Sequence, residues 1–287
     1  MIAYVFPGQG SQFKGMGKTL FDEYRTLSDL ADEVLGYSIR ELCVQDPSQQ
    51  LNHTQYTQAA IYVVSALSYV DWFEQDAQKA DFFAGHSLGE YSALFAAGVF
   101  DFATGLRLVK KRGELMAQAS QGGMAAVIGL DAPQIEHILL EHGFSNIDVA
   151  NFNSPSQTVL SGDSAELKVA AAVFAKHQAK FIPLSVSAAF HSRYMRQAQH
   201  EFASYLQQVP LRAARKPVIA NVTALPHQPD ALRQLLAEQI TAPVRWLHSV
   251  EYLLAQGVRE FKELGPGAVL TKLVDVIKTN HAAVAKV

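Results

Sequence analysis

The sequence predicts an α/β protein in which a large subdomain with a parallel sheet carries a smaller inserted subdomain. The first observation is a strand, a sharp turn and a helix around residues 80–91, a unit typical of α/β sheets. The second is a change of pattern at about residue 124, where strands and helices begin to alternate differently. The third is that further strand patterns follow this insertion, so the large sheet is interrupted and then resumed. We expect the large subdomain in 1–123 and 195–287, and the small one in 124–194.

Composition limits the class of protein and its partners. The chain has 287 residues, 49% of them hydrophobic and 18% charged, which is typical of a soluble globular protein with a large core. The net charge of −3, without a concentrated basic face, gives no reason to expect nucleic acid. The longest apolar stretch, 59–70, contains serines and is shorter than the ~20 residues that span a bilayer. Since no export leader is evident either, we expect a cytoplasmic protein without a membrane partner.

The single cysteine, Cys43, fits a reducing compartment. One cysteine cannot form an internal disulfide or a thiolate metal cluster, and no histidine stands near it in the sequence. His137 and His142 are five residues apart, so they lie on different faces of a predicted helix and are poor ligands for one metal. We therefore expect neither a metal site nor a catalytic cysteine.

The first strand is expected at residues 2–6, where the sequence is continuously apolar. The loop that follows, 7–12, is too rich in glycine to continue either kind of secondary structure. Gln9 is thereby placed at the carboxyl edge of the sheet, where open α/β sheets bind ligands. A phosphate-binding loop is the alternative, but neither of the usual glycine-rich spacings is present. Three helical patterns follow as expected scaffold: 16–35, 38–44 and 54–75.

The rest of the chain is organised around Ser87. A short apolar strand stops at Gly85 and a helix starts after Gly89, so the segment fits the G-x-S-x-G nucleophile elbow. The glycines are needed because a side chain at either position would collide with the neighbouring strand or helix. The peptide N–H of Leu88 opens the helix without an intrahelical partner and can bind an oxyanion. The same pattern also occurs by chance in glycine-rich loops, but the flanking strand and helix favour the elbow.

Arg112 interrupts the apolar face of a second helix, expected at 103–119 after a break at 98–101. At about 100° per residue it falls between Leu108 and Met116, whereas the other basic residues of the helix lie on the opposite face. A guanidinium on a buried face needs a partner, either a structural carboxylate or a bound anion. The pattern alone leaves both possibilities open.

The inserted segment has the strand–helix–strand–strand–helix–strand order of a ferredoxin-like subdomain. His191 follows its last strand, at the junction of the two subdomains, where clefts usually form. The elements expected in the insertion are strands at 124–130, 147–151, 157–161 and 180–187 and helices at 132–142 and 163–178. Those expected after it are helices at 195–208, 229–239 and 244–255, strands at 217–222 and 258–262, and a final helix.

Several motifs occur in a fixed order: Phe6-Pro7-Gly8-Gln9-Gly10-Ser11-Gln12, Gly85-His86-Ser87-Leu88-Gly89-Glu90, Arg112, Asn153, Phe190-His191 and Glu263-Leu264-Gly265-Pro266-Gly267. In these motifs the chain closely resembles the malonyl-CoA:acyl carrier protein transacylases, over nearly its whole length. That family includes the enzymes of fatty-acid synthesis and the free-standing acyltransferases that serve polyketide synthases in trans. The resemblance implies an α/β-hydrolase-like large subdomain, a ferredoxin-like insertion and an active site in the cleft between them.

The resemblance also implies roles for the residues of the reaction centre. Ser87 matches the nucleophile of the family and His191 matches its general base. Gln9 and Leu88 match the residues whose backbone N–H groups form the oxyanion hole. The family has no acidic third member after the serine, and a backbone carbonyl orients the histidine instead; the matching residue is Gln239.

Two further residues match positions that contact the acyl group. Arg112 matches the arginine that binds the free malonyl carboxylate, and Phe190 resembles the residue before the base in malonyl-selective members. The sequence departs from the family at 242–244, Ala-Pro-Val in place of Asn-Pro-Val, and at 58–60, Gln-Ala-Ala in place of Gln-Pro-Ala. Neither change removes a reacting group, so they affect only the expected loop geometry.

By resemblance, the protein transfers malonyl from malonyl-CoA to the phosphopantetheine thiol of an acyl carrier protein, through a malonyl-serine intermediate and without a cofactor. We expect a monomer that acts on carrier proteins in trans. The segment 187–191, Ser-Ala-Ala-Phe-His, favours polyketide assembly, with fatty-acid synthesis as the alternative. An acyl hydrolase that clears stalled thioesters is a second hypothesis. Arg112 argues against it, because hydrolysing diverse acyl groups gains nothing from a carboxylate clamp. The third is an inactive module that docks carrier proteins.

Overall fold

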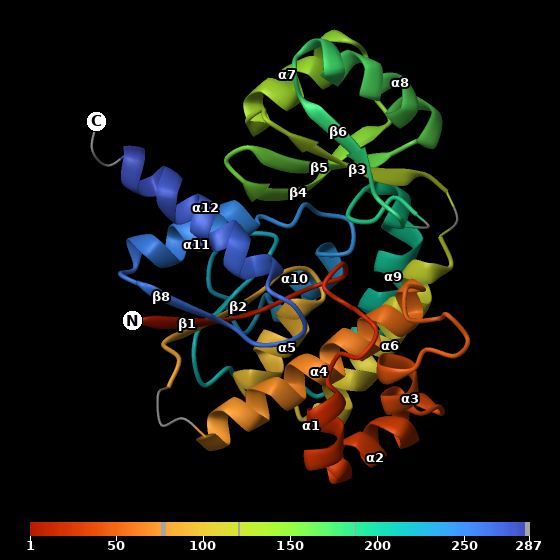
Figure 1. Cartoon of the computed structure of the whole chain (residues 1–287), viewed down its shortest axis with the longest axis vertical. Helices are drawn as coiled ribbons and strands as arrows, with labels where there is room; N and C mark the ends of the chain where they lie inside the picture. The colour runs from red at the N-terminus through yellow and green to blue at the C-terminus, as the bar shows by residue number, and fades with distance from the viewer. Residues whose placement is uncertain (76–78, 120, 187, 285–287) are drawn as a thin grey trace.

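The chain forms one parallel and one antiparallel β-sheet in a computed structural model that describes residues 1–75, 79–119, 121–186 and 188–284 (Figure 1). The parallel sheet has the strand order β7-β2-β1-β8 and consists of β1 (Ile2–Phe6), β2 (Phe82–Gly85), β7 (Val218–Ile219) and β8 (Glu260–Glu263). The antiparallel sheet has the order β4-β5-β3-β6 and consists of β3 (Gly123–Ile128), β4 (Ile147–Ser154), β5 (Gln157–Gly162) and β6 (Lys180–Pro183). The predicted α/β class, with a parallel sheet and a separate smaller sheet, is confirmed.

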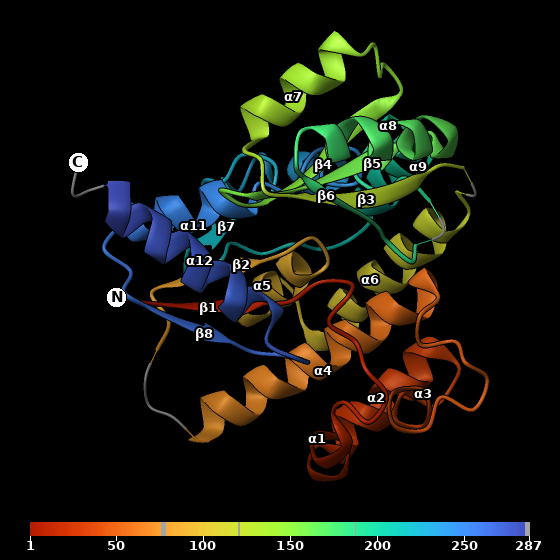
Figure 2. The ribbon, with the colours of Figure 1, turned by 45° about the horizontal axis from the view of Figure 1, so that its top comes forward.

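Helices cover both faces of the parallel sheet, as parallel strands require (Figure 2). One face carries α4 (Thr54–Gln75), α5 (Gly89–Ala96) and α6 (Phe102–Ala117), and the other carries α11 (Trp246–Ala255) and α12 (Val269–Val284). The side chains of β1 alternate between the two layers. Tyr4 and Phe6 join the core beneath α4 and α5, whereas Ala3 and Val5 join the core beneath α11 and α12.

The large part departs from the sequence predictions in two places, one helix and one strand. The helix predicted at 16–35 is divided at Tyr24, whose ψ of 53° is not helical, into α1 (Lys18–Glu23) and α2 (Arg25–Leu35). The strand predicted at 217–222 stops at Ile219, because the chain then turns back and the N–H of Ala220 bonds to the carbonyl of Leu225. The other helices are α3 (Ile39–Val44), α9 (Arg196–Leu206), which follows a 3₁₀ turn at Arg193–Met195, and α10 (Leu232–Glu238).

The antiparallel sheet has the strand order of the ferredoxin-like pattern, with the first strand of the insertion, β3, between the third and the fourth. Two helices, α7 (Ala132–Glu141) and α8 (Ser164–Lys176), pack on one face against Ala125 and Val127. From the other face, Met124 and Ala126 join the core of the large part. The two sheets are therefore connected by a continuous apolar contact.

The subdomain boundaries proposed at 123/124 and 194/195 stay a prediction. The strand predicted at 180–187 is shorter than expected, since β6 ends at Pro183, and Ser187 lies outside the described residues.

Within the part of the chain that the structure describes, no helix combines the length and apolar character needed to cross a membrane.

Candidate active site

Ser87 lies in the turn between β2 and α5, with φ of +51° in the left-handed region. A β-carbon at Gly85 would come within 1.9 Å of the carbonyl carbon of Gly89. A β-carbon at Gly89 would come within 2.0 Å of the carbonyl oxygen of Phe6. Both distances are far below any possible contact, which confirms the steric reason for the two glycines. The turn therefore holds a serine in a strained conformation at the carboxyl edge of the sheet.

The hydroxyl of Ser87 forms a hydrogen bond with a histidine from a distant part of the sequence, the segment between β6 and α9. The distance from its Oγ to Nε2 of His191 is 2.8 Å. On the opposite side of the ring, Nδ1 lies 2.7 Å from the carbonyl oxygen of Gln239 and 3.2 Å from that of Ala242. A carbonyl oxygen can only accept, so Nδ1 carries the proton and Nε2 is free to take the proton of the serine.

His191 is neutral at ordinary pH. Burial away from water and, second, the nearby charge of Arg112 lower the pKa of His191 from 6.5 to about 3. Hydrogen bonds from Nδ1 to the two carbonyl oxygens act in the opposite direction but are weaker. A base that stays unprotonated well below neutral pH is ready to accept a proton throughout the physiological range.

Arg112 brings a positive charge to the same place. Its side chain is 1% exposed, and its Nη2 donates to Oγ of Ser87 at 3.1 Å. Two amide oxygens accept its other hydrogen bonds, Oε1 of Gln58 at 2.7 Å and Oε1 of Gln239 at 3.0 Å. The guanidinium carbon also lies 5.5 Å from the centre of the Tyr91 ring.

The partner of this buried arginine is not a structural carboxylate. Among the ion pairs of the described residues, none involves Arg112. Of the two possibilities that the sequence left open, the structure therefore favours a bound anion. Neutral amide acceptors hold the guanidinium in place beside the nucleophile and leave its charge without an ion-pair partner.

The other predicted residues line one cavity of about 100 Å³ with Ser87, Arg112 and His191. Gln9 lies in the loop after β1, and Leu88 is the first residue after the serine, at the N-terminal end of α5. Phe190, directly before the histidine, forms part of the apolar wall. All the sequence-predicted site residues except Gln239 line this cavity, and Gln239 lies behind Arg112 and His191 and contacts both.

Sequence reasoning missed several polar side chains around the turn. Asn221 accepts a hydrogen bond from the N–H of Ser87 at 2.7 Å and donates to the carbonyl of Gly85 at 2.6 Å. The strand predicted at 217–222 contained Asn221, whereas β7 ends at Ile219 and leaves Asn221 beyond the carboxyl end of the strand. Gln239 was given only a backbone role, although its side chain contacts Arg112. Nε2 of His86, a residue of the recognised motif, lies 2.9 Å from Oδ1 of Asn153.

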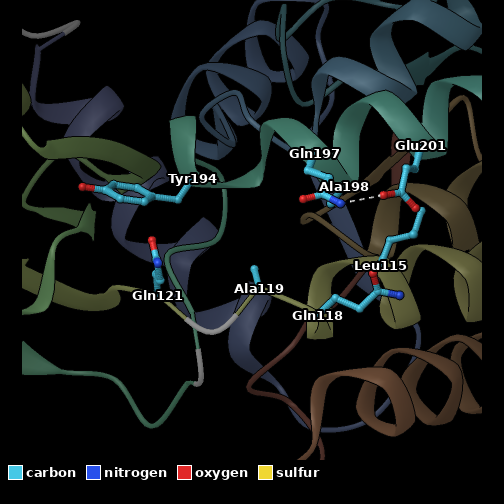
Figure 3. A pocket seen from close by; sticks show the side chains of 8 residues that line it. All are labelled: Leu115, Gln118, Ala119, Gln121, Tyr194, Gln197, Ala198 and Glu201. Carbon is cyan, nitrogen blue, oxygen red and sulfur yellow. Dashed lines mark hydrogen bonds between the residues drawn. The ribbon is translucent and has the colours of Figure 1, made fainter.

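A larger cavity of about 410 Å³ lies elsewhere, between α6 and α9 (Figure 3). Its side chains are amides, small apolar groups, Tyr194 and Glu201, and Gln197 donates to Glu201 at 3.0 Å. Among the described residues that line it, no nucleophile is paired with a base. Among the described residues, no three histidine, cysteine or carboxylate side chains are grouped to hold a metal ion.

Comparison with known proteins gives consistent results. Residues 3–286 match the family model described as the acyl transferase domain. The chain is 52% identical over 285 residues to the polyketide biosynthesis malonyl CoA-acyl carrier protein transacylase BaeC of Bacillus velezensis, and the match covers 99% of each chain. The crystal structure of the malonyl CoA-acyl carrier protein transacylase from Burkholderia pseudomallei has a TM-score of 0.95 and 50% identity, and the match covers 97% of this chain and 98% of that one.

A third similar structure contains a protein partner. It is a malonyl-transacylase in complex with a type II PKS acyl-carrier protein, with a TM-score of 0.92 and 37% identity. The match covers 97% of this chain and 91% of that one. The likeness therefore extends over both sheets.

The low pKa of His191 predicts an unusual pH dependence for reagents that attack Ser87. Inactivation by a fluorophosphonate should keep its full rate down to about pH 5, where a histidine of ordinary pKa would be almost entirely protonated. In Arg112→Gln the second cause of the low pKa is absent, so the pH at which the rate constant falls should be higher. Burial should still keep the pKa of His191 below 6.5. The measurement is the second-order rate constant of inactivation against pH, on protein shown by circular dichroism to be folded.

Arg107→Gln is the matched control, since it removes an exposed cation from the same helix and should leave the pH dependence of the rate constant unchanged. This electrostatic account would be contradicted if the rate constant of the wild-type protein fell at pH 6.5. It would also be contradicted if Arg112→Gln did not change the pH at which the rate constant falls.

Proposed function

The chain belongs to the acyl transferase domain family, and we propose that it transfers a malonyl group from malonyl-CoA to the phosphopantetheine thiol of an acyl carrier protein. The observation that carries the proposal is Arg112, which is buried without an ion-pair partner among the described residues and lies 3.1 Å from the nucleophilic oxygen. A guanidinium at this place suits an acyl group that ends in a carboxylate, because its planar edge offers two parallel hydrogen bonds. The names of the similar proteins agree with this substrate.

In the first half of the reaction, His191 takes the proton of Ser87 through Nε2 while Oγ attacks the thioester carbonyl. The backbone N–H groups of Gln9 and Leu88 receive the oxyanion of the tetrahedral intermediate. When this intermediate collapses, the bond from carbon to sulfur breaks and His191 returns the proton to the leaving thiolate. Coenzyme A departs as a thiol, and malonyl-Ser87 remains.

In the second half, the phosphopantetheine thiol of the carrier protein attacks the ester, and His191 again acts as the base. The new thioester forms as the bond to Oγ breaks, and Ser87 regains its proton. Water is the competing nucleophile, and the apolar wall of the cavity, which includes Phe190, disfavours it. The thioester of malonyl-CoA and then the ester of Ser87 supply the carbonyl that is attacked, so the proposed reaction uses no cofactor and no metal.

The protein is proposed to act in trans, as a monomer, on carrier proteins of a polyketide synthase. The supporting observation is that BaeC, which is 52% identical over almost the full length of both chains, is named for polyketide biosynthesis. Fatty-acid synthesis is the alternative pathway. Cys43 is fully buried as a free thiol, which fits a cytoplasmic location.

The choice between acyl groups is proposed to depend on Phe190 and Leu88, which flank the base and the nucleophile in the same cavity. Both side chains are large and buried, and the cavity of about 100 Å³ is small. A methyl branch on the malonyl group would have to displace one of them. The protein is therefore proposed to prefer malonyl over methylmalonyl.

The central test is mass spectrometry of the intact protein after mixing with malonyl-CoA. A malonyl adduct should form on Ser87 and persist until a carrier protein is added, whereas Ser87→Ala should form none. Arg112→Gln should form the malonyl adduct about 100-fold more slowly, because a pair of charge-assisted hydrogen bonds is lost. Its slow reaction with acetyl-CoA, which has no carboxylate, should change much less.

The outcomes separate the three hypotheses. Rapid hydrolysis of both acyl groups without an adduct would indicate a hydrolase that clears thioesters. Transfer retained by Ser87→Ala would refute the serine mechanism. No reaction with any acyl-CoA would leave the docking module.

Phe190→Ala should weaken the selection against a methyl branch. The wild-type protein should have a higher kcat/KM for malonyl-CoA than for methylmalonyl-CoA, and the variant should reduce this ratio by about tenfold, as expected for one methyl group in a close-fitting apolar site. Val186→Ala widens the same cavity at a residue that is not adjacent to the base in sequence, and serves as the control. Comparable kcat/KM values for both substrates in the wild-type protein would refute the proposed selectivity.

The pathway can be tested with two purified carrier proteins, one from a polyketide synthase and one from fatty-acid synthesis. The polyketide carrier should have the higher kcat/KM by about tenfold, which corresponds to about 1.4 kcal/mol of transition-state binding. Equal values, or a preference for the fatty-acid carrier, would assign the protein to the alternative pathway.

A further inference from the structure

The N–H and the carbonyl of Ser87 are held by the side chains of two residues that both donate hydrogen bonds to one buried carboxylate, that of Glu90. The N–H of Ser87 donates to Oδ1 of Asn221 at 2.7 Å, and its carbonyl accepts from Nε2 of Gln239 at 2.9 Å. Oε2 of Glu90 accepts from the backbone N–H of Asn221 at 3.1 Å and from the same Nε2 of Gln239 at 2.6 Å. The residues that fix the nucleophile are thus fixed in turn by a single oxygen atom.

The other oxygen of this carboxylate is occupied by His227. Its Nε2 lies 2.6 Å from Oε1 of Glu90, and the two side chains are 4% and 1% exposed. Within the described residues, Nδ1 of His227 has no hydrogen-bond partner. The proton of the ring therefore belongs on Nε2, where it faces the carboxylate. The loop after β7 brings His227 back to this place, since its N–H bonds to the carbonyl of Val218.

A deeply buried carboxylate and a residue with a strained backbone lie side by side here. A carboxylate so deeply buried is unfavourable unless several donors satisfy it, and here three donors from separate parts of the chain converge on it. Directly beside it, Ser87 has a left-handed φ that a residue with a side chain rarely adopts. Such a conformation persists only where the surrounding groups determine it.

We propose that Glu90, held by His227, is a positioning residue for the nucleophile, acting on Ser87 through Asn221 and Gln239. The proposal rests on the role of Ser87 in the proposed function, but not on the identity of the acyl group. Glu90 touches no reacting atom. Its carboxylate determines which end of the Gln239 amide faces which neighbour.

The orientation of Gln239 matters because three parts of this residue are in use. Its Nε2 faces Glu90 and the carbonyl of Ser87, its Oε1 accepts from Arg112, and its backbone carbonyl accepts from His191. Without an acceptor at Glu90, the amide can rotate and place its NH₂ group against the guanidinium. One carboxylate therefore helps to fix the positions of the nucleophile, the base and the cation relative to one another.

The test compares two substitutions of almost equal volume. Glu90→Leu removes the acceptor, and Glu90→Gln keeps one carbonyl oxygen for the N–H of Asn221 and the Nε2 of Gln239. In Glu90→Gln, the new NH₂ group can face Nε2 of His227 once the ring proton moves to Nδ1. The readout is the rate constant of Ser87 inactivation by a fluorophosphonate, on protein shown to be folded by circular dichroism and gel filtration.

Glu90→Leu should lower this rate constant by about 100-fold, the usual effect of misplacing a reacting group by about 1 Å. Glu90→Gln should lower it by less than about tenfold, because the acceptor is retained. A folded Glu90→Leu protein that reacts at the wild-type rate would overturn the proposal. So would an equal loss in both variants, because the acceptor geometry would then not matter.

If Glu90→Leu does not fold, Asn221→Ala gives a second test. It leaves Glu90 and His227 paired and removes only the link to the peptide of Ser87. The same inactivation rate should fall by at least about tenfold, and an unchanged rate would overturn the proposal. Because the fluorophosphonate carries no malonyl group, a failure of malonyl transfer would leave this test intact, so the two proposals fail separately.

Discussion

The hydrogen bond between Oγ of Ser87 and Nε2 of His191 is the contact on which the rest of the site depends. It joins two residues 104 positions apart, one in a turn of the parallel sheet and the other in the segment after the antiparallel sheet. Its length of 2.8 Å leaves little tolerance for movement between the sheets. The shared apolar contact through Met124 and Ala126 therefore helps to keep the two side chains within hydrogen-bond distance, although neither residue is polar.

The charge of Arg112 acts on this contact in two ways. Together with burial, which is the larger cause, it lowers the pKa of His191, so that the imidazole is neutral before a substrate arrives. It also offers the carboxylate of a malonyl group a partner that no described protein carboxylate occupies as an ion pair. In the proposed reaction these effects are linked, since a bound carboxylate would offset the charge of the guanidinium and raise the pKa of His191. The correct substrate would thus bring the base closer to the pKa that proton transfer requires.

The sequence allowed most of the fold to be predicted, because the relevant signals are local. The elbow, the strand–helix alternation and the apolar face that contains Arg112 all lie within short segments. The contacts of Asn221 and Gln239 could not be predicted in this way. Asn221 reaches Ser87 across 134 positions, and Gln239 reaches Glu90 across 149. No periodicity records such pairings, and the predicted strand at 217–222 even placed Asn221 inside a ladder that ends two residues earlier.

The short segment Gly-His-Ser-Leu-Gly-Glu combines local and distant constraints, which explains why a glutamate belongs in it. A negative charge in the first turn of α5 is favourable for the helix, but it also weakens the positive potential that would otherwise help an oxyanion at the same end. His227 partly offsets that charge by donating to Glu90. In the proposed reaction, stabilisation of the oxyanion must then come from the directed N–H groups of Gln9 and Leu88 rather than from the helix as a whole. The N–H of Leu88 is effective only if the turn is rigid, and in our proposal the hydrogen bonds that Glu90 accepts provide that rigidity.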